Sequence, residues 1–115
     1  MSRSLEVAAQ AHAIDMVRRN YFSHLTPAGL TVSDRIRRTA YASSRTRLRA
    51  GEDIAWADGT LATPSQVVRG WMASPGHRAN ILSWSYRHLG VGLALGAPRF
   101  AGGGATYTVD FASRG

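Results

Sequence analysis

The chain has 115 residues, 44% of them hydrophobic, which suits one globular domain and is too short for two. It has no cysteine, no run of about 20 apolar residues and no recognisable signal peptide, which excludes disulfides, thiolate catalysis, sulfur-ligated zinc and a membrane-spanning segment. All 14 basic residues are arginine against 7 acidic residues, and the formal net charge of +7 points to anionic partners.

The N-terminal part of the chain is predicted to be helical. Residues 4–20 carry apolar side chains at helical spacing, with two arginines near the end, where cations suit the helix dipole. A turn then follows, which places His24 on a loop just past this helix. Thr31 with Asp34 three residues later predicts the start of a second, short helix.

An arginine-rich segment follows the second predicted helix. Six arginines fall between Arg35 and Arg49, enough to attract nucleic acid, phospholipid headgroups or an anionic cell-envelope polymer. Tyr41 is its single aromatic residue, and no nucleic-acid-binding motif is present, which disfavours nucleic acid. A solvated basic face is the simpler interpretation of this segment.

Two further helices are predicted after a short strand at residues 51–56. Thr63-Pro64-Ser65-Gln66 is a capping box with proline at the first helical position, and Trp71 of this helix is expected to pack on the sheet. Ser74-Pro75-Gly76-His77 begins the next helix, with the serine oxygen expected to accept a hydrogen bond from the His77 backbone N–H. Taken alone, His77 is either a metal ligand or proton acceptor, or a polar capping residue.

The last third of the chain reads as a β-hairpin. Residues 89–95 alternate large apolar side chains with small residues, so one face belongs to the core and the other admits close backbone approach. We expect a glycine-rich loop over 96–104 and a second, antiparallel strand over 105–111. Asp110 of that strand is expected to point away from the core, solvated or paired with arginine. Helices followed by strands indicate an α+β fold.

Several other polar residues stand out less. Asn80 is expected to tie a loop or turn through side-chain hydrogen bonds. His12 and His88 have no partner that the sequence identifies.

Five motifs in this order resemble the CAP or SCP superfamily of cysteine-rich secretory, antigen five and pathogenesis-related proteins, in a bacterial, cysteine-free form. They are Tyr21-Phe22-Ser23-His24, Gly51-Glu52-Asp53-Ile54-Ala55, the run from Trp71 to Leu82, Leu89-Gly90-Val91-Gly92 and Tyr107-Thr108-Val109-Asp110-Phe111. The resemblance implies an α-β-α sandwich, with a small antiparallel sheet flanked by helices, and a location outside the cell or in the cell envelope. Because members usually have one more helix at the start, residues 1–115 are expected to be a single, N-terminally trimmed domain.

The resemblance also implies a cleft with two histidines and two glutamates. These positions fall on His24, Glu52 and His77, while Ser74 stands where the second glutamate is expected and Asp53 where the family usually has asparagine. One carboxylate is therefore missing. His24 and His77 would form a partial shell for a divalent metal, zinc first, with water and Glu52 as further ligands.

Three functions are compatible with these residues. The first is a ligand-binding module in which His24, Glu52, Ser74 and His77 contact a small hydrophobic or anionic ligand, since some members bind sterols or lipids. The second is a metal-dependent hydrolase or peptidase with His24, Glu52 and His77 as catalytic residues, although H-E-x-x-H, G-x-S-x-G and a cysteine nucleophile are all absent. The third, nucleic-acid binding, rests on the arginine cluster alone.

Overall fold

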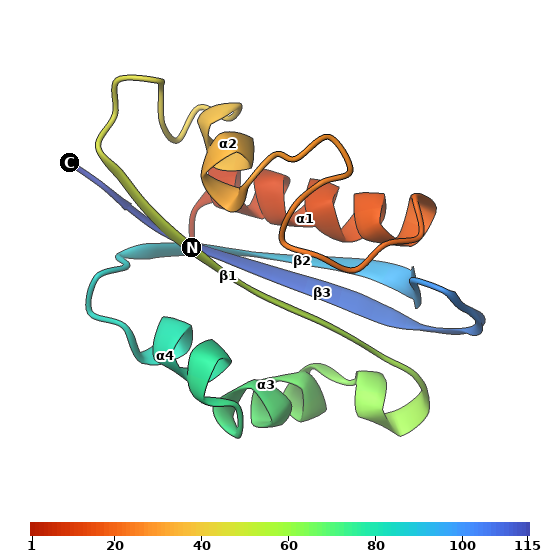
Figure 1. The fold of residues 1–115 in the computed structure, drawn as a ribbon. Coiled ribbons are helices and arrows are strands. Elements are labelled where there is room, and N and C mark those ends of the chain that lie inside the picture. The colour runs from red at the N-terminus through yellow and green to blue at the C-terminus, as the bar shows by residue number, and fades with distance from the viewer.

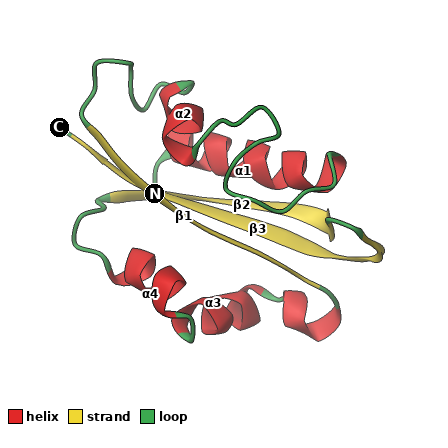
Figure 2. Cartoon of the chain, in the orientation of Figure 1, coloured by secondary structure: helices red, strands yellow, loops and turns green.

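The structure is a computed structural model that describes the backbone of residues 1–115 and all side chains except those of residues 100–102. Its elements are α1 (Arg3–Arg18), α2 (Val32–Arg37), β1 (Leu48–Ala57), the 3-10 helix η1 (Gly59–Ala62), α3 (Pro64–Met72), α4 (Pro75–Leu82), β2 (His88–Ala97) and β3 (Phe100–Arg114). The strands form one antiparallel sheet in the order β1-β3-β2. Helices α1 and α2 cover one face, and α3 and α4 cover the other (Figures 1 and 2). The predicted α-β-α sandwich is confirmed.

The starts of α2 and α3 follow the predicted capping signals. Thr31 Oγ1 accepts from the Asp34 backbone N–H, and Asp34 Oδ2 accepts from the Thr31 backbone N–H, so α2 begins with a complete capping box. At α3, Thr63 Oγ1 accepts from the Gln66 backbone N–H. No helix in the described chain is long and apolar enough to cross a membrane.

Helix α1 lies against β2 at two glycines. A Cβ atom at Gly90 would lie 2.1 Å from the backbone N of Glu6, and one at Gly92 would lie 2.4 Å from the backbone carbon of Ala9. Because the obstructing atoms are backbone atoms, only glycine permits this separation. The close approach predicted for this face of the strand is therefore correct. The core on this side consists of Leu5, Ala8, Ile36, Tyr41, Ala42 and Ala112.

The opposite face of the sheet packs on α3. Its core consists of Val67, Trp71, Ala105, Tyr107, Val109 and Phe111. Trp71 is almost fully buried, and its Nε1–H donates to the backbone oxygen of Ile54 at 3.2 Å. The structural role predicted for Trp71 is confirmed, because this bond fixes α3 to the edge strand β1.

The sheet is longer than the sequence suggested. The predicted loop over 96–104 is wrong, because β2 continues to Ala97 and β3 begins at Phe100. Strand β1 likewise runs from Leu48 to Ala57, paired with β3 over its whole length. Within β3, Gly104 has a φ of +127°, and a Cβ there would lie 2.6 Å from the Ala57 oxygen. Gly104 therefore permits β3 to pass close to the end of β1.

Candidate functional site

A buried ion pair at the centre of β1 is the core of the candidate site. Arg35 of α2 donates from Nη1 to Glu52 Oε2 at 2.7 Å and from Nη2 to Glu52 Oε1 at 3.0 Å. Only 9% of the Arg35 side chain and 1% of the Glu52 side chain are exposed. Arg35 therefore does not belong to the solvated basic face expected for its segment. The short helix α2 positions this guanidinium over the sheet.

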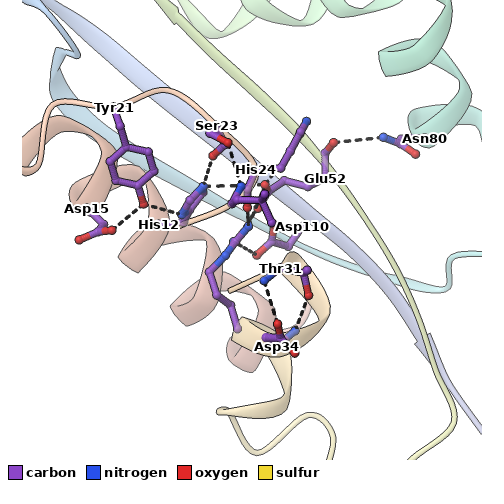
Figure 3. A network of polar contacts seen from close by, with 12 residues as sticks. His12, Asp15, Tyr21, Ser23, His24, Thr31, Asp34, Glu52, Asn80 and Asp110 are labelled. Carbon is purple, nitrogen blue, oxygen red and sulfur yellow. Dashed lines mark hydrogen bonds and ion pairs between the residues drawn. The ribbon is translucent and has the colours of Figure 1, made fainter. Parts of the chain in front are cut away.

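His24 is held by both members of this ion pair. Its Nδ1 lies 2.8 Å from Glu52 Oε1, and because a carboxylate only accepts, the ring donates through Nδ1–H. Arg35 Nη2 also donates to the backbone oxygen of His24 at 2.7 Å. Figure 3 shows His24 and Glu52 within this network. Since the His24 side chain is 53% exposed, its remaining nitrogen, Nε2, is the atom available to a ligand.

The surroundings of Glu52 and His24 determine the charge that each carries. Burial opposes ionisation of Glu52, but the interactions with His24, with the neighbouring Asp110 carboxyl and with Arg35 outweigh it and lower the pKa of Glu52 to about 2. The same hydrogen bond to Glu52 raises the pKa of His24. Glu52 is therefore a carboxylate at neutral pH, and His24 takes up a proton more readily than a free histidine does.

Asp110 differs from its predicted environment. It lies opposite Glu52 in the β1–β3 pair and is fully buried, with Arg35 Nη1 4.0 Å from its Oδ2. Of the two expected environments, solvation is wrong because α1 and α2 cover this face of the sheet, whereas the contact with Arg35 is the arginine neighbour that the sequence predicted. Neither Asp110 oxygen makes a hydrogen bond of ordinary geometry among the described residues. Burial, reinforced by nearby Glu52, raises the pKa of Asp110 to about 10, so this carboxyl group is neutral at pH 7.

His77 and Ser74 form a second pair, at the start of α4. The His77 Nδ1 lies 3.0 Å from Ser74 Oγ, and its ring stacks on Trp71 with centroids 6.3 Å apart. Ser74 is the N-cap residue, as predicted, but the expected side-chain cap hydrogen bond is absent. The Ser74 hydroxyl is instead hydrogen-bonded to the His77 imidazole, which fixes the orientation of the ring.

Asp53 links the two pairs electrostatically. Asn80 Nδ2 donates to Asp53 Oδ1 at 2.8 Å and to the Glu52 backbone oxygen at 3.2 Å, so Asn80 ties α4 to a strand rather than a turn. Burial raises the pKa of Asp53, while the Asn80 hydrogen bond and then the charges of His77 and His24 lower it. Both imidazoles therefore act on one carboxyl group. The structure brings His24 to Glu52 and His77 to Ser74, and Asp53 follows Glu52 in β1.

A groove borders the second pair. It has a volume of about 310 Å³ and lies along β1 and α3. Most of its lining is apolar or aromatic, including Trp56 and Trp71, and its polar lining residues are Gln66, Ser74 and His77. Such a lining, apolar with few polar groups, is typical of small-molecule sites.

Sequence reasoning missed a further residue that positions His24. His12 of α1 is buried, and its Nε2–H donates to the backbone oxygen of Ser23 at 2.8 Å (Figure 3). Burial lowers the pKa of His12 and favours the neutral ring, and the bond to Ser23 places the proton of that ring on Nε2. The available signal was its place among apolar residues on the buried face of the first helix. His88 also has a partner, since its Nδ1 lies 2.7 Å from the Tyr41 hydroxyl.

The donor set limits what metal the site could hold. Among the side chains that the structure describes, no group of three or more His, Asp or Glu residues could hold an ion. Glu52 has both oxygens engaged by Arg35, so it does not fit as a ligand, but it orients His24 as an outer-shell carboxylate orients a metal-binding histidine. The Nε2 atoms of His24 and His77 are left, which fits a weak site at most.

Two helical layers around a small antiparallel sheet, with a loop histidine bonded to a glutamate of the edge strand, define an α-β-α sandwich of the CAP or SCP type. The chain belongs to the CAP family, the cysteine-rich secretory protein family, whose model matches residues 1–111. The resemblance seen in the sequence motifs is confirmed.

Two curated relatives come from Bacillus subtilis (strain 168). The uncharacterized protein YkwD is 36% identical over 92 residues, which cover 80% of this chain and 33% of that protein. The uncharacterized membrane protein YlbC is 38% identical over 87 residues, covering 74% of this chain and 22% of that protein. The chain thus spans a third or less of the length of these relatives.

Two solved structures share the fold. One is an extracellular protein containing a SCP domain from Bacillus anthracis str. Ames, with a TM-score of 0.68 and 30% identity over 96% of this chain and 32% of that chain. The other, an outer surface protein from Borrelia burgdorferi, has a TM-score of 0.74 and covers 99% of this chain and 76% of that chain. Its 21% identity supports likeness of fold alone.

Proposed function

We propose that this domain is a ligand-binding module of an extracellular or cell-envelope protein. The groove between β1 and α3 takes the apolar part of a small ligand, and Ser74 and His77 contact its polar or anionic group. His24 and Glu52 form the second polar part of the cleft. The Bacillus anthracis neighbour, described as extracellular, supports this location.

The observation that carries the proposal is the fixed imidazole beside an apolar groove. His77 is held from one side by Ser74 Oγ and from the other by the Trp71 ring. A ring held in this way loses little freedom when a ligand binds, so its hydrogen bond costs less entropy than one from a mobile side chain. An apolar lining with one oriented polar group favours an amphipathic ligand.

Filling the groove tests this function. Gly70 of α3 lines the groove, and a Cβ there would meet no atom within 4 Å, so Gly70→Leu is expected to fold and to occupy the ligand's place. We expect the anionic fluorophore anilinonaphthalene sulfonate to bind the wild type and to bind Gly70→Leu at least about tenfold more weakly. A tenfold loss corresponds to the burial of about one apolar group of the ligand. Fluorescence titration measures both.

Gly76→Leu is the matched control for this experiment. Gly76 is also helical, also has open space at its Cβ position, and does not line the groove. Its titration should match the wild type. Equal affinities of the wild type and Gly70→Leu for the fluorophore would show that the groove is not the binding site.

A second candidate is a metal-dependent hydrolase or peptidase, favoured by one observation, the His24–Glu52 hydrogen bond. Here His24 and His77 would hold the ion through Nε2, and Glu52 would keep His24 oriented. A divalent metal would supply Lewis acidity and an activated water. Both rings must be neutral to bind it, and the raised pKa of His24 makes a proton a strong competitor.

Zinc binding tests the shared histidine site. We expect weak binding at pH 7.5 that falls at least about tenfold at pH 5.5, because the His24 ring gains its proton as pH falls through its raised pKa. Calorimetry on the wild type, His24→Ala and His77→Ala measures this, with His88→Ala as the control. If either of the first two variants bound zinc as tightly as the wild type, the two histidines would not share an ion.

A further inference from the structure

Positive charge gathers at one end of the sheet, from segments far apart in the sequence. Arg49 lies at the start of β1, opposite Ser113 near the end of β3, and Arg87 directly precedes β2. Figure 1 shows the start of β1, the loop before β2 and the C-terminal end of β3 at the same end of the molecule. Arg47, Arg49, Trp84, Arg87 and Arg114 all line one hollow of about 250 Å³ there. We call Arg47, Arg49, Arg87 and Trp84 the basic end.

The guanidinium groups of the basic end are available to a partner. Those of Arg47, Arg49 and Arg87 make no hydrogen bond or ion pair with any described residue, and no Asp or Glu lines the hollow. Arg114 differs, since it donates to the Tyr41 backbone oxygen and lies 4.2 Å from the centre of the Tyr41 ring. Like charges held together with no acidic side chain among them favour an anionic partner.

Apolar side chains protrude beside these charges. The Trp84 side chain is 98% exposed, and Leu82, two residues earlier, is 54% exposed. A tryptophan on the surface has an apolar body and one N–H group, which suits the boundary between headgroups and acyl chains. Neither residue lines the groove beside His77, so this surface is separate from the proposed ligand site.

We propose that the basic end docks the domain on an anionic phospholipid surface, with Trp84 inserted at the headgroup level and the three arginines on lipid phosphates. Guanidinium groups bind phosphate oxygens through two parallel N–H donors. Adjacent apolar and cationic side chains on a protruding loop match a membrane interface. A single aromatic side chain provides no row of stacking platforms for a nucleic-acid strand, which disfavours that partner.

Vesicle binding by purified protein tests the proposal. The wild type should bind vesicles of phosphatidylglycerol and phosphatidylcholine at low salt, lose binding at high salt, and ignore pure phosphatidylcholine. The triple variant Arg47→Gln, Arg49→Gln, Arg87→Gln should lose on the order of a hundredfold in affinity. Trp84→Phe should remove the blue shift of tryptophan emission that accompanies wild-type binding.

A second triple variant separates the basic end from general charge. Arg18→Gln, Arg38→Gln, Arg69→Gln removes the same three charges from the net +7 at exposed positions on other elements. It should keep affinity within a few-fold of wild type, and circular dichroism should show all variants folded. Equal losses in the two triples, no blue shift in the wild type, or tighter binding to a soluble oligonucleotide than to anionic vesicles would each overturn the proposal.

Discussion

The variant Arg35→Met is expected to lose about 3–5 kcal/mol of unfolding free energy, because it leaves the Glu52 carboxylate buried without its cation. Glu52 is 1% exposed, and Arg35 binds both of its oxygens. His24 alone cannot replace two charge-assisted hydrogen bonds. Urea denaturation at pH 7 measures the loss.

Two comparisons make this result specific to the ion pair. Arg38→Met removes an exposed arginine at the end of the same helix and should change stability by no more than about 0.5 kcal/mol. Adding Glu52→Gln to Arg35→Met should recover part of the loss, since it removes the uncompensated charge. A cost below about 1 kcal/mol for Arg35→Met would show that water reaches Glu52.

The second large effect concerns pH and the neutral carboxyl of Asp110. Its folded pKa is about 10 against an ordinary 3.8, so between these values the folded chain holds a proton that the unfolded chain releases. Stability therefore falls as pH rises through this window, by up to about 1.4 kcal/mol per pH unit. Glu52 has the opposite sign, but its pKa of about 2 against 4.5 confines its effect to acid.

Asp110→Asn should remove this dependence. An asparagine has nearly the shape of a protonated aspartate, can donate to Glu52, and carries no proton to lose. From pH 6 to pH 8 the variant should gain up to about 3 kcal/mol in stability relative to the wild type. Urea denaturation of both proteins at each pH measures the difference, in which His24 and His12 largely cancel. A difference that stays constant with pH would mean that Asp110 is ionised in the fold.

The sequence predicted the features that depend on local chemistry. The cap of α2 at Thr31 and Asp34 and the close approach at Gly90 and Gly92 follow from backbone sterics and hydrogen bonding, and the structure contains them. The family resemblance placed His24 with Glu52, and they are 2.8 Å apart. Such features can be predicted from residues that are adjacent in the chain or from a known motif.

The features that sequence missed depend on residues that are distant in the chain. Arg35 is one of six arginines in its segment, and nothing in the spacing distinguishes the one that reaches Glu52, 17 residues away. Asp110 follows the alternation of a strand with one wet face, but this sheet is covered on both faces, so alternation no longer separates core from solvent. The glycines before Ala105 suggest a loop by propensity, yet β2 runs to Ala97 and β3 begins at Phe100, because Ala97 pairs with Phe100 across the hairpin.

The two glycines of β2 also determine how far His24 is from Glu52. Backbone contact at Gly90 and Gly92 sets how closely α1 lies on the sheet. Further along that helix, the His12 ring donates a hydrogen bond to the backbone oxygen of Ser23, one residue before His24. The distance between the His24 imidazole and the Glu52 carboxylate therefore depends on two glycines that contact neither group. A bulkier residue at either glycine would misalign the cleft without changing any residue in it.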